Sequence, residues 1–92
     1  MTEYEFDEAK SLRNIDDRGF DFDFASRIFE GPIIEFEDNR RDYGEERFIA
    51  IGRVDDIYLT VVYTWREHRR RIISARKASR KERDVYDQAI NE

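Results

Sequence analysis

The most chemically distinctive part of the chain is segment 66–83, which contains nine basic and two acidic residues. Within it, the residue pattern of 70–75 predicts a β-strand, and successive side chains of a strand point to opposite faces of a sheet. Two sets should therefore face opposite ways: Arg71, Ile73 and Ala75, and against them Arg70, Ile72, Ser74 and Arg76. An arginine beside apolar residues on a sheet is suited to gripping a phosphate through two parallel hydrogen bonds. The alternative is an arginine-rich edge strand that discourages association between sheets.

A basic sheet face can support cleavage of RNA through the ribose 2′-hydroxyl. That reaction needs no metal or cofactor, only a base for the hydroxyl, an acid for the leaving oxygen and cations for the charge of the transition state. Arginines, lysines and tyrosines can supply the cations and protons, and Glu45 or Glu46 can supply the base. The composition permits this chemistry without requiring it.

Other classes of chemistry are disfavoured by what the sequence lacks. It has no cysteine, one histidine, His68, in a predicted turn, and no glycine-rich phosphate loop. Disulfides, thiolate chemistry, a structural zinc site and nucleotide hydrolysis are therefore not expected, and no cofactor is predicted. The longest uncharged run, 57–65, is far shorter than a membrane helix needs, and the acidic N-terminus does not resemble a signal peptide, so we expect a cytoplasmic protein with no membrane contact.

The net charge of −5 hides an asymmetry between the two halves of the chain. Residues 1–46 carry fifteen acids and six bases, whereas residues 47–92 carry seven acids and eleven bases. Such a split favours a basic face for an anion on an otherwise acidic protein. The plainer interpretation is that these are solvated faces of unequal sign.

Hydrophobic periodicity predicts a single α+β domain over residues 1–92, with the order β-α-α-β-β-β-β-α. We expect an antiparallel sheet with two N-terminal helices packed on one face and a separable C-terminal helix. The expected strands are 4–6, 33–37, 47–53, 57–65 and 70–75, with 57–65 central; the expected helices are 8–17, 20–30 and 80–90. Alternating phenylalanines at 20–24 also fit a strand, but the apolar spacing through residue 29 favours a helix. The last helix opens on a capping box, Ser79 with Glu82, and has little apolar surface, so it can lie against a partner.

Several motifs in order along the chain resemble the BrnT family. They are Phe6-Asp7-x-x-Lys10-x-x-x-Asn14, Gly19-Phe20, Phe24-Ala25-x-x-x-Phe29, Glu45-Glu46-Arg47-Phe48-x-Ala50-x-Gly52, and Arg71-Ile72-Ile73-Ser74-Ala75-Arg76-Lys77-Ala78 followed by Glu82 and Tyr86. The resemblance runs from residue 4 to residue 86. It implies a RelE-like fold and a ribonuclease toxin of a type II toxin–antitoxin system. It also implies neutralisation by a BrnA-like ribbon-helix-helix antitoxin, through which the complex would bind operator DNA.

From the residues and the resemblance together we expect three sets of site residues. The catalytic set is Arg71, Arg76, Arg47, Glu46 and Lys10; the RNA-binding set is Arg18, Asn14 and Lys77; the antitoxin-binding set is Arg69, Arg80 and Arg83. Arg71 and Arg76 are expected to hold the scissile phosphate. Strand alternation sets Glu46 and Arg47 on opposite faces unless Glu46 lies before the strand, which leaves Tyr63 or Tyr86 as other proton donors.

One departure from the family pattern bears on activity. The family usually has Lys-His-Gly before the second helix, where this chain has Asp17-Arg18-Gly19. Arg18 can bind phosphate but cannot shuttle protons near neutral pH. Two hypotheses follow: an endoribonuclease toxin, or a weakened or inactive binding module of the same fold acting in an antitoxin complex. A third, a generic α+β interaction domain, would apply if the motifs were accidental.

Overall fold

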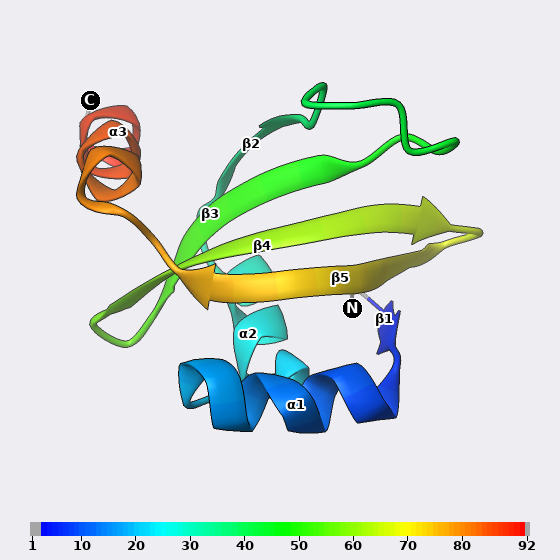
Figure 1. Ribbon diagram of the computed structural model, residues 1–92. Helices are drawn as coiled ribbons and strands as arrows, with labels where there is room; N and C mark the ends of the chain where they lie inside the picture. Colours follow the sequence, from blue (N-terminus) through cyan, green and yellow to red (C-terminus); the bar gives the residue numbers. More distant parts are fainter. Residues whose placement is uncertain (1–2, 92) are drawn as a thin grey trace.

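The computed structural model describes residues 3–91, and its elements follow the predicted order (Figure 1). They are β1 (Glu3–Phe6), α1 (Glu8–Arg18), α2 (Phe22–Ser26), the 3-10 turn η1 (Arg27–Glu30), β2 (Ile34–Glu37), β3 (Phe48–Val54), β4 (Ile57–Arg66), β5 (Arg69–Lys77) and α3 (Arg80–Ile90). The prediction of an α+β fold is confirmed.

The five strands form one sheet in the order β1-β5-β4-β3-β2, with β4 in the centre as predicted. Strands β2 to β5 form the antiparallel meander, whereas β1 pairs with β5 in parallel, with Tyr4 opposite Arg70. The sheet is therefore mixed rather than wholly antiparallel. Parallel pairing becomes available to β1 because a long connection that includes α1 separates it from its neighbour.

The predicted second helix is shorter than its sequence pattern suggested. Helix α1 ends at Gly19, whose φ of 90° is left-handed, and α2 begins only after Asp21, whose side chain accepts a hydrogen bond from Phe24 N. From Arg27 the helix tightens into η1 and ends before Gly31. The apolar spacing was correct for burial but did not reveal this change of helix type.

Helices α1 and α2 and the turn η1 cover one face of the sheet, which we call the helix face (Figure 1). The core lies there, where alternate β4 residues Leu59, Val61 and Tyr63 are fully buried. The opposite face, which we call the open face, carries α3 at one end and the loop of residues 38–47 at the other (Figure 1). Helix α3 rests on it through Tyr86, whose ring packs edge-on against Tyr58. Among residues 3–91, no helix is long and apolar enough to cross a membrane.

Candidate functional site

A β-bulge brings the two arginines expected on opposite faces onto the same face. In β5, Ile72 pairs with Tyr63 and Ser74 pairs with Val62, so Ile73 is the extra residue. Beyond this point the alternation of β5 is reversed, as the extra residue of a bulge requires. The predicted face assignment is therefore wrong: Ile72 and Ala75 both lie in the core, and Arg71 and Arg76 both lie on the open face.

Arg71 and Arg47 lie on either side of Thr64 on the open face. Arg71 pairs with Thr64 across β4 and β5, while Thr64 Oγ1 donates a 2.6 Å hydrogen bond to the carbonyl oxygen of Glu46, just before β3. Two strand spacings place the Cα atoms of the arginines about 10 Å apart. The Arg71 guanidinium is 3.7 Å from the Glu5 carboxylate of β1 and retains 29% exposure, so it can bind an anion.

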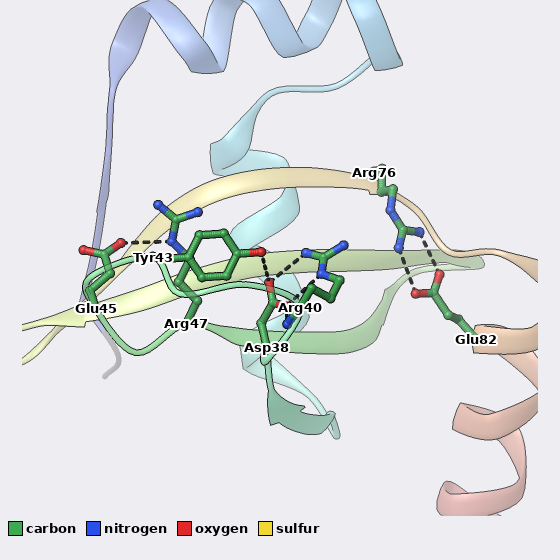
Figure 2. A network of polar contacts seen from close by, with 7 residues as sticks. All are labelled: Asp38, Arg40, Tyr43, Glu45, Arg47, Arg76 and Glu82. Carbon is green, nitrogen blue, oxygen red and sulfur yellow. Dashed lines mark hydrogen bonds and ion pairs between the residues drawn. The ribbon is translucent and has the colours of Figure 1, made fainter.

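The loop of residues 38–47 holds Arg47 in place. Its guanidinium carbon lies 4.1 Å from the centre of the Tyr43 ring, and its Nε donates to Glu45 at 3.0 Å (Figure 2). Tyr43 in turn donates from its hydroxyl to Asp38. Stacking on an aromatic ring fixes the plane of a guanidinium while leaving its outer N–H groups available. The charge-dense loop thus orients one predicted catalytic side chain.

Asp38 and Arg40 are functional candidates that sequence reasoning missed. The Asp38 side chain is fully buried, and Arg40 donates to both of its oxygens at 2.7 Å (Figure 2). These hydrogen bonds lower the pKa of Asp38 to about 2. The Asp-x-Arg spacing was visible in the sequence, but nothing local indicated that the carboxylate would be buried.

Arg76 is held by Glu82 at the opposite end of the open face. Its guanidinium donates to both Glu82 oxygens, at 2.7 and 2.9 Å, and Glu82 also accepts from Thr60 Oγ1 and from Ser79 N of the predicted capping box. The bond with Arg76 is the main reason why the pKa of Glu82 falls to about 2. A carboxylate with so low a pKa cannot act as a general base near neutral pH.

Glu82→Gln is expected to lower the free energy of unfolding at pH 7 by about 1–3 kcal/mol. The folded-state pKa of Glu82 lies below its ordinary 4.5, so the pair's contribution is present above about pH 4.5 and is lost as pH falls towards 2. The stability gap between variant and wild type should therefore close over that range, as followed by urea unfolding. Asp84→Asn, an exposed acid on the same helix, is the control. A gap independent of pH would contradict the assignment.

Glu46, the predicted base, lies before β3, which begins at Phe48. The strand alternation that would set Glu46 and Arg47 on opposite faces therefore does not apply to Glu46. Its side chain is exposed, and its carbonyl oxygen accepts from Thr64 beside Arg71. The other proton donors considered are unsuited to the task. Tyr63 is buried on the helix face with its hydroxyl bonded to Glu35, and Tyr86 is buried with its hydroxyl bonded to the Pro32 carbonyl oxygen.

Lys10 and Asn14 lie on α1 beside the edge of β5. They line a shallow groove of about 210 Å³ together with Ile73 and Ser74. A hydrogen bond from Lys10 N is the main reason why the pKa of Asp7 is lowered. Phe6, just before Asp7, pairs with Ile72 of β5, so the start of α1 lies near Arg71. Asn14 also has a structural task, since its Nδ2 donates to the Phe20 carbonyl oxygen at 2.8 Å.

Arg18 and Lys77 lie together in a different place. They line a hollow of about 450 Å³ whose other walls are mostly apolar. Lys77 pairs with Leu59, so both belong to the helix face. The structure therefore separates Arg18 and Lys77 from Arg71, Arg76 and Arg47.

The three expected antitoxin contacts are also spread out. Arg69 begins β5 and pairs with Glu3 at 3.4 Å, whereas Arg80 and Arg83 lie on α3 beyond the other end of that strand. The eight residue steps of β5 span about 26 Å. His68 lies exposed in the turn between β4 and β5, as predicted. Among residues 3–91, no group of three or more potential metal-binding side chains comes together.

A known protein family matches most of this chain. The family model described as ribonuclease toxin, BrnT, of type II toxin-antitoxin system matches residues 6–82. No curated protein matches the chain. The matched region contains Arg71 and Arg76 of the bulged strand, the loop that orients Arg47 and the capping box of α3.

Proposed function

The chain belongs to the BrnT family of ribonuclease toxins of type II toxin–antitoxin systems, and on this premise we propose that it cleaves RNA on the open face without a metal ion. The observation that carries the proposal is the pair Arg71 and Arg47, whose Cα atoms lie about 10 Å apart across Thr64. Two guanidinium groups with outer N–H groups available can grip one phosphate between them. We place this activity in the cytoplasm, where RNA and a partner antitoxin meet.

In the proposed reaction the Glu46 carboxylate takes the proton of a ribose 2′-hydroxyl. The freed oxygen attacks the adjacent phosphorus, and the bond from phosphorus to the 5′-oxygen of the next nucleotide breaks. Arg71 and Arg47 neutralise the charge gathered on the phosphoryl oxygens, and Lys10 at the edge of β5 donates the proton that the leaving 5′-oxygen takes up. The products are a 2′,3′-cyclic phosphate and a 5′-hydroxyl.

The purified protein is expected to cut single-stranded RNA in the presence of a chelator and to leave the same sequence in DNA uncut, because DNA lacks the attacking hydroxyl. Glu46→Gln should slow cleavage by about 10²-fold or more, the usual contribution of a general base. Glu37→Gln, which changes an exposed acid of β2, is the control and should leave cleavage unchanged. Gel analysis of the products measures the cleavage of RNA and of DNA by the wild type and the cleavage of RNA by the two variants. Loss of activity on chelation would contradict the metal-free mechanism.

A second candidate function is a weakened or inactive binding module. It is favoured by the acid partners of Arg71, Arg47 and Arg76, which are Glu5, Glu45 and Glu82, and by the absence of the family histidine at position 18. A protein of this kind would bind RNA or antitoxin without cleaving. Absence of cleavage by a folded, RNA-binding wild-type protein would establish it.

Arg18→His distinguishes a reaction on the open face from one in the hollow. Since Arg18 lines the hollow on the helix face, the substitution is expected to change the cleavage rate by less than about twofold, or ~0.4 kcal/mol in the barrier. A clear rise in rate would instead mean that the histidine restores a missing catalytic group, and that the reaction takes place beside Lys77. Initial rates on one RNA under identical conditions provide the measurement.

For the partner we propose a BrnA-like ribbon-helix-helix antitoxin that covers α3 and the adjoining end of β5. Arg80 and Arg83 are exposed there, and Val85 and Ile90 of the same helix keep 45% and 40% exposure, so α3 presents apolar surface beside its basic side chains. Operator DNA would be reached only through the antitoxin. Arg69, about 26 Å away along β5, would lie at the far limit of such a contact.

The association rate with this antitoxin is expected to fall on the order of tenfold between low and physiological salt, because acidic groups would be steered to the arginines. Arg80→Ala and Arg83→Ala should each reduce the rate at low salt and weaken its dependence on salt. Arg27→Ala, an exposed arginine of η1, is the control. Stopped-flow mixing gives the rates, and a rate independent of salt would rule out charge steering.

A further inference from the structure

Arg40 is fixed in direction yet remains available to a ligand. Its Nε and one Nη2 hydrogen are bound by Asp38, whose side chain is fully buried, so the guanidinium cannot swing freely. Two of its five N–H donors are used in these bonds. The Arg40 side chain nevertheless keeps 63% exposure. A guanidinium anchored on one edge and exposed on the other is preorganised to receive an anion.

Arg76 has the same construction on the other side of the open face. Glu82 binds it with two hydrogen bonds (Figure 2). The Arg76 side chain keeps 40% exposure. The hydrogen bonds to Glu82 raise the pKa of Arg76. Figure 2 shows the guanidinium groups of Arg40 and Arg76 as neighbours in that view of the open face. An anion placed between two such groups would be held by both.

This pair of arginines lies apart from the proposed site of cleavage. Arg76 follows Arg71 by five residues on β5, which separates their Cα atoms by about 15 Å. Arg71 is instead neighboured by Arg47 across Thr64. The expectation that Arg71 and Arg76 grip the same phosphate therefore fits the geometry less well than two separate positions, each with its own pair of arginines.

We propose that Arg40 and Arg76 form a second phosphate site, which binds a backbone phosphate of the same RNA strand on one side of the scissile position. This inference rests on the proposed function, because it extends the strand bound at Arg71 and Arg47 along the open face. Asp38 and Glu82 act as positioning residues that aim the two guanidinium groups. The loop of residues 38–47 then has two tasks: it orients Arg47 at the reaction and Arg40 on the neighbouring phosphate.

The test uses the full chain and a single-stranded RNA of about ten nucleotides, within the length that single-strand sites cover. Every ribose carries a 2′-O-methyl group, so the RNA cannot be cut. Binding is measured by fluorescence anisotropy at several salt concentrations. Arg40→Ala and Arg76→Ala should each weaken binding about 5- to 10-fold and reduce the slope of log K against log salt by roughly 0.7. Arg41→Ala, which removes the same charge from the adjacent residue, should change neither quantity.

The double variant Arg40→Ala/Arg76→Ala decides whether one phosphate is shared. If it is, the double variant should bind RNA with nearly the affinity of the single variant that binds less tightly. Once one arginine is removed, the phosphate is no longer held at the site and the other arginine contributes little. Arg40→Lys should restore the salt slope but not the full affinity, since an ammonium lacks the bidentate geometry. On cleavable RNA, Arg40→Ala should raise KM and leave kcat nearly unchanged.

Two failures can be told apart. Wild-type binding that Arg40→Ala does not alter, or effects of the two single variants that simply add, would overturn the second phosphate site and leave the proposed function standing. Absence of RNA binding by the wild type would overturn both. The melting temperature of each variant is recorded alongside, so that loss of affinity through unfolding of Arg76→Ala is recognised.

Discussion

Arg71→Ala is expected to reduce RNA cleavage by about 10²- to 10³-fold, the usual effect of removing one donor that stabilises transition-state charge. The melting temperature should hardly change. The side chain lies at the surface of the sheet, and its contact with Glu5, at 3.7 Å, is longer than a hydrogen bond. The loss would therefore fall on chemistry rather than on folding, and it should appear in kcat.

Two further variants sharpen this result. Arg66→Ala removes an exposed arginine from the end of β4 and should leave cleavage unchanged. Arg71→Lys keeps the charge but loses the paired N–H groups, so its activity should lie between those of the wild type and the alanine variant. If Arg71→Ala lowered the melting temperature as much as it lowered activity, the side chain would be structural and its catalytic assignment would fail.

Gly52→Ala is expected to destabilise the fold by about 1–3 kcal/mol, the usual range for an overpacked core. A Cβ at this position would lie 2.7 Å from Ile28 Cβ and 3.1 Å from Ile33 Cγ2. Neither neighbour can yield easily, because Ile28 is fully buried in η1 and its Cβ is attached directly to the backbone. The melting temperature should fall by roughly 5–15 °C for a domain of this size.

Gly31→Ala provides the matched control for this glycine. A Cβ there meets nothing within 4 Å, and its φ of −127° is accessible to any residue, so its melting temperature should stay close to that of the wild type. Calorimetry or thermal circular dichroism compares the two variants. An unchanged melting temperature for Gly52→Ala would mean that η1 does not approach β3 as closely as the structure shows.

Features that depend on neighbours in the chain were predictable from the sequence. The N-cap of α1 is such a case: Asp7 accepts from Lys10 N, as its residue type and position indicated. The capping box of α3 is another, since both of its reciprocal bonds form between Ser79 and Glu82. The mostly apolar, β-branched and aromatic run of 57–65 likewise predicted the central strand. Each of these signals is local, because the groups involved lie within one turn of helix or along one strand.

Features that depend on burial or on distant partners were not predictable in this way. Nothing in the residues around Asp38 indicates that its carboxylate would be enclosed and would fix Arg40. Similarly, Arg18 was grouped with the phosphate-binding arginines by its charge, although it lies in the hollow of the helix face. Charge can be counted in a sequence, but the face on which it lies depends on how the elements pack.

The bulge in β5 is the clearest division between the two kinds of information. The amino-acid sequence predicted an arginine-rich strand over residues 70–75, since local propensity and apolar pattern suffice for that, and the structure extends this strand to residues 69–77. Strict alternation then set Arg71 and Arg76 on opposite faces. Only the pairing with β4 decided otherwise: one extra residue, Ile73, lets Ile72 and Ala75 both enter the core and turns Arg76 to the side of Arg71. A one-residue shift in register reverses every later side chain, and it is settled by the packing of the whole sheet rather than by any residue alone.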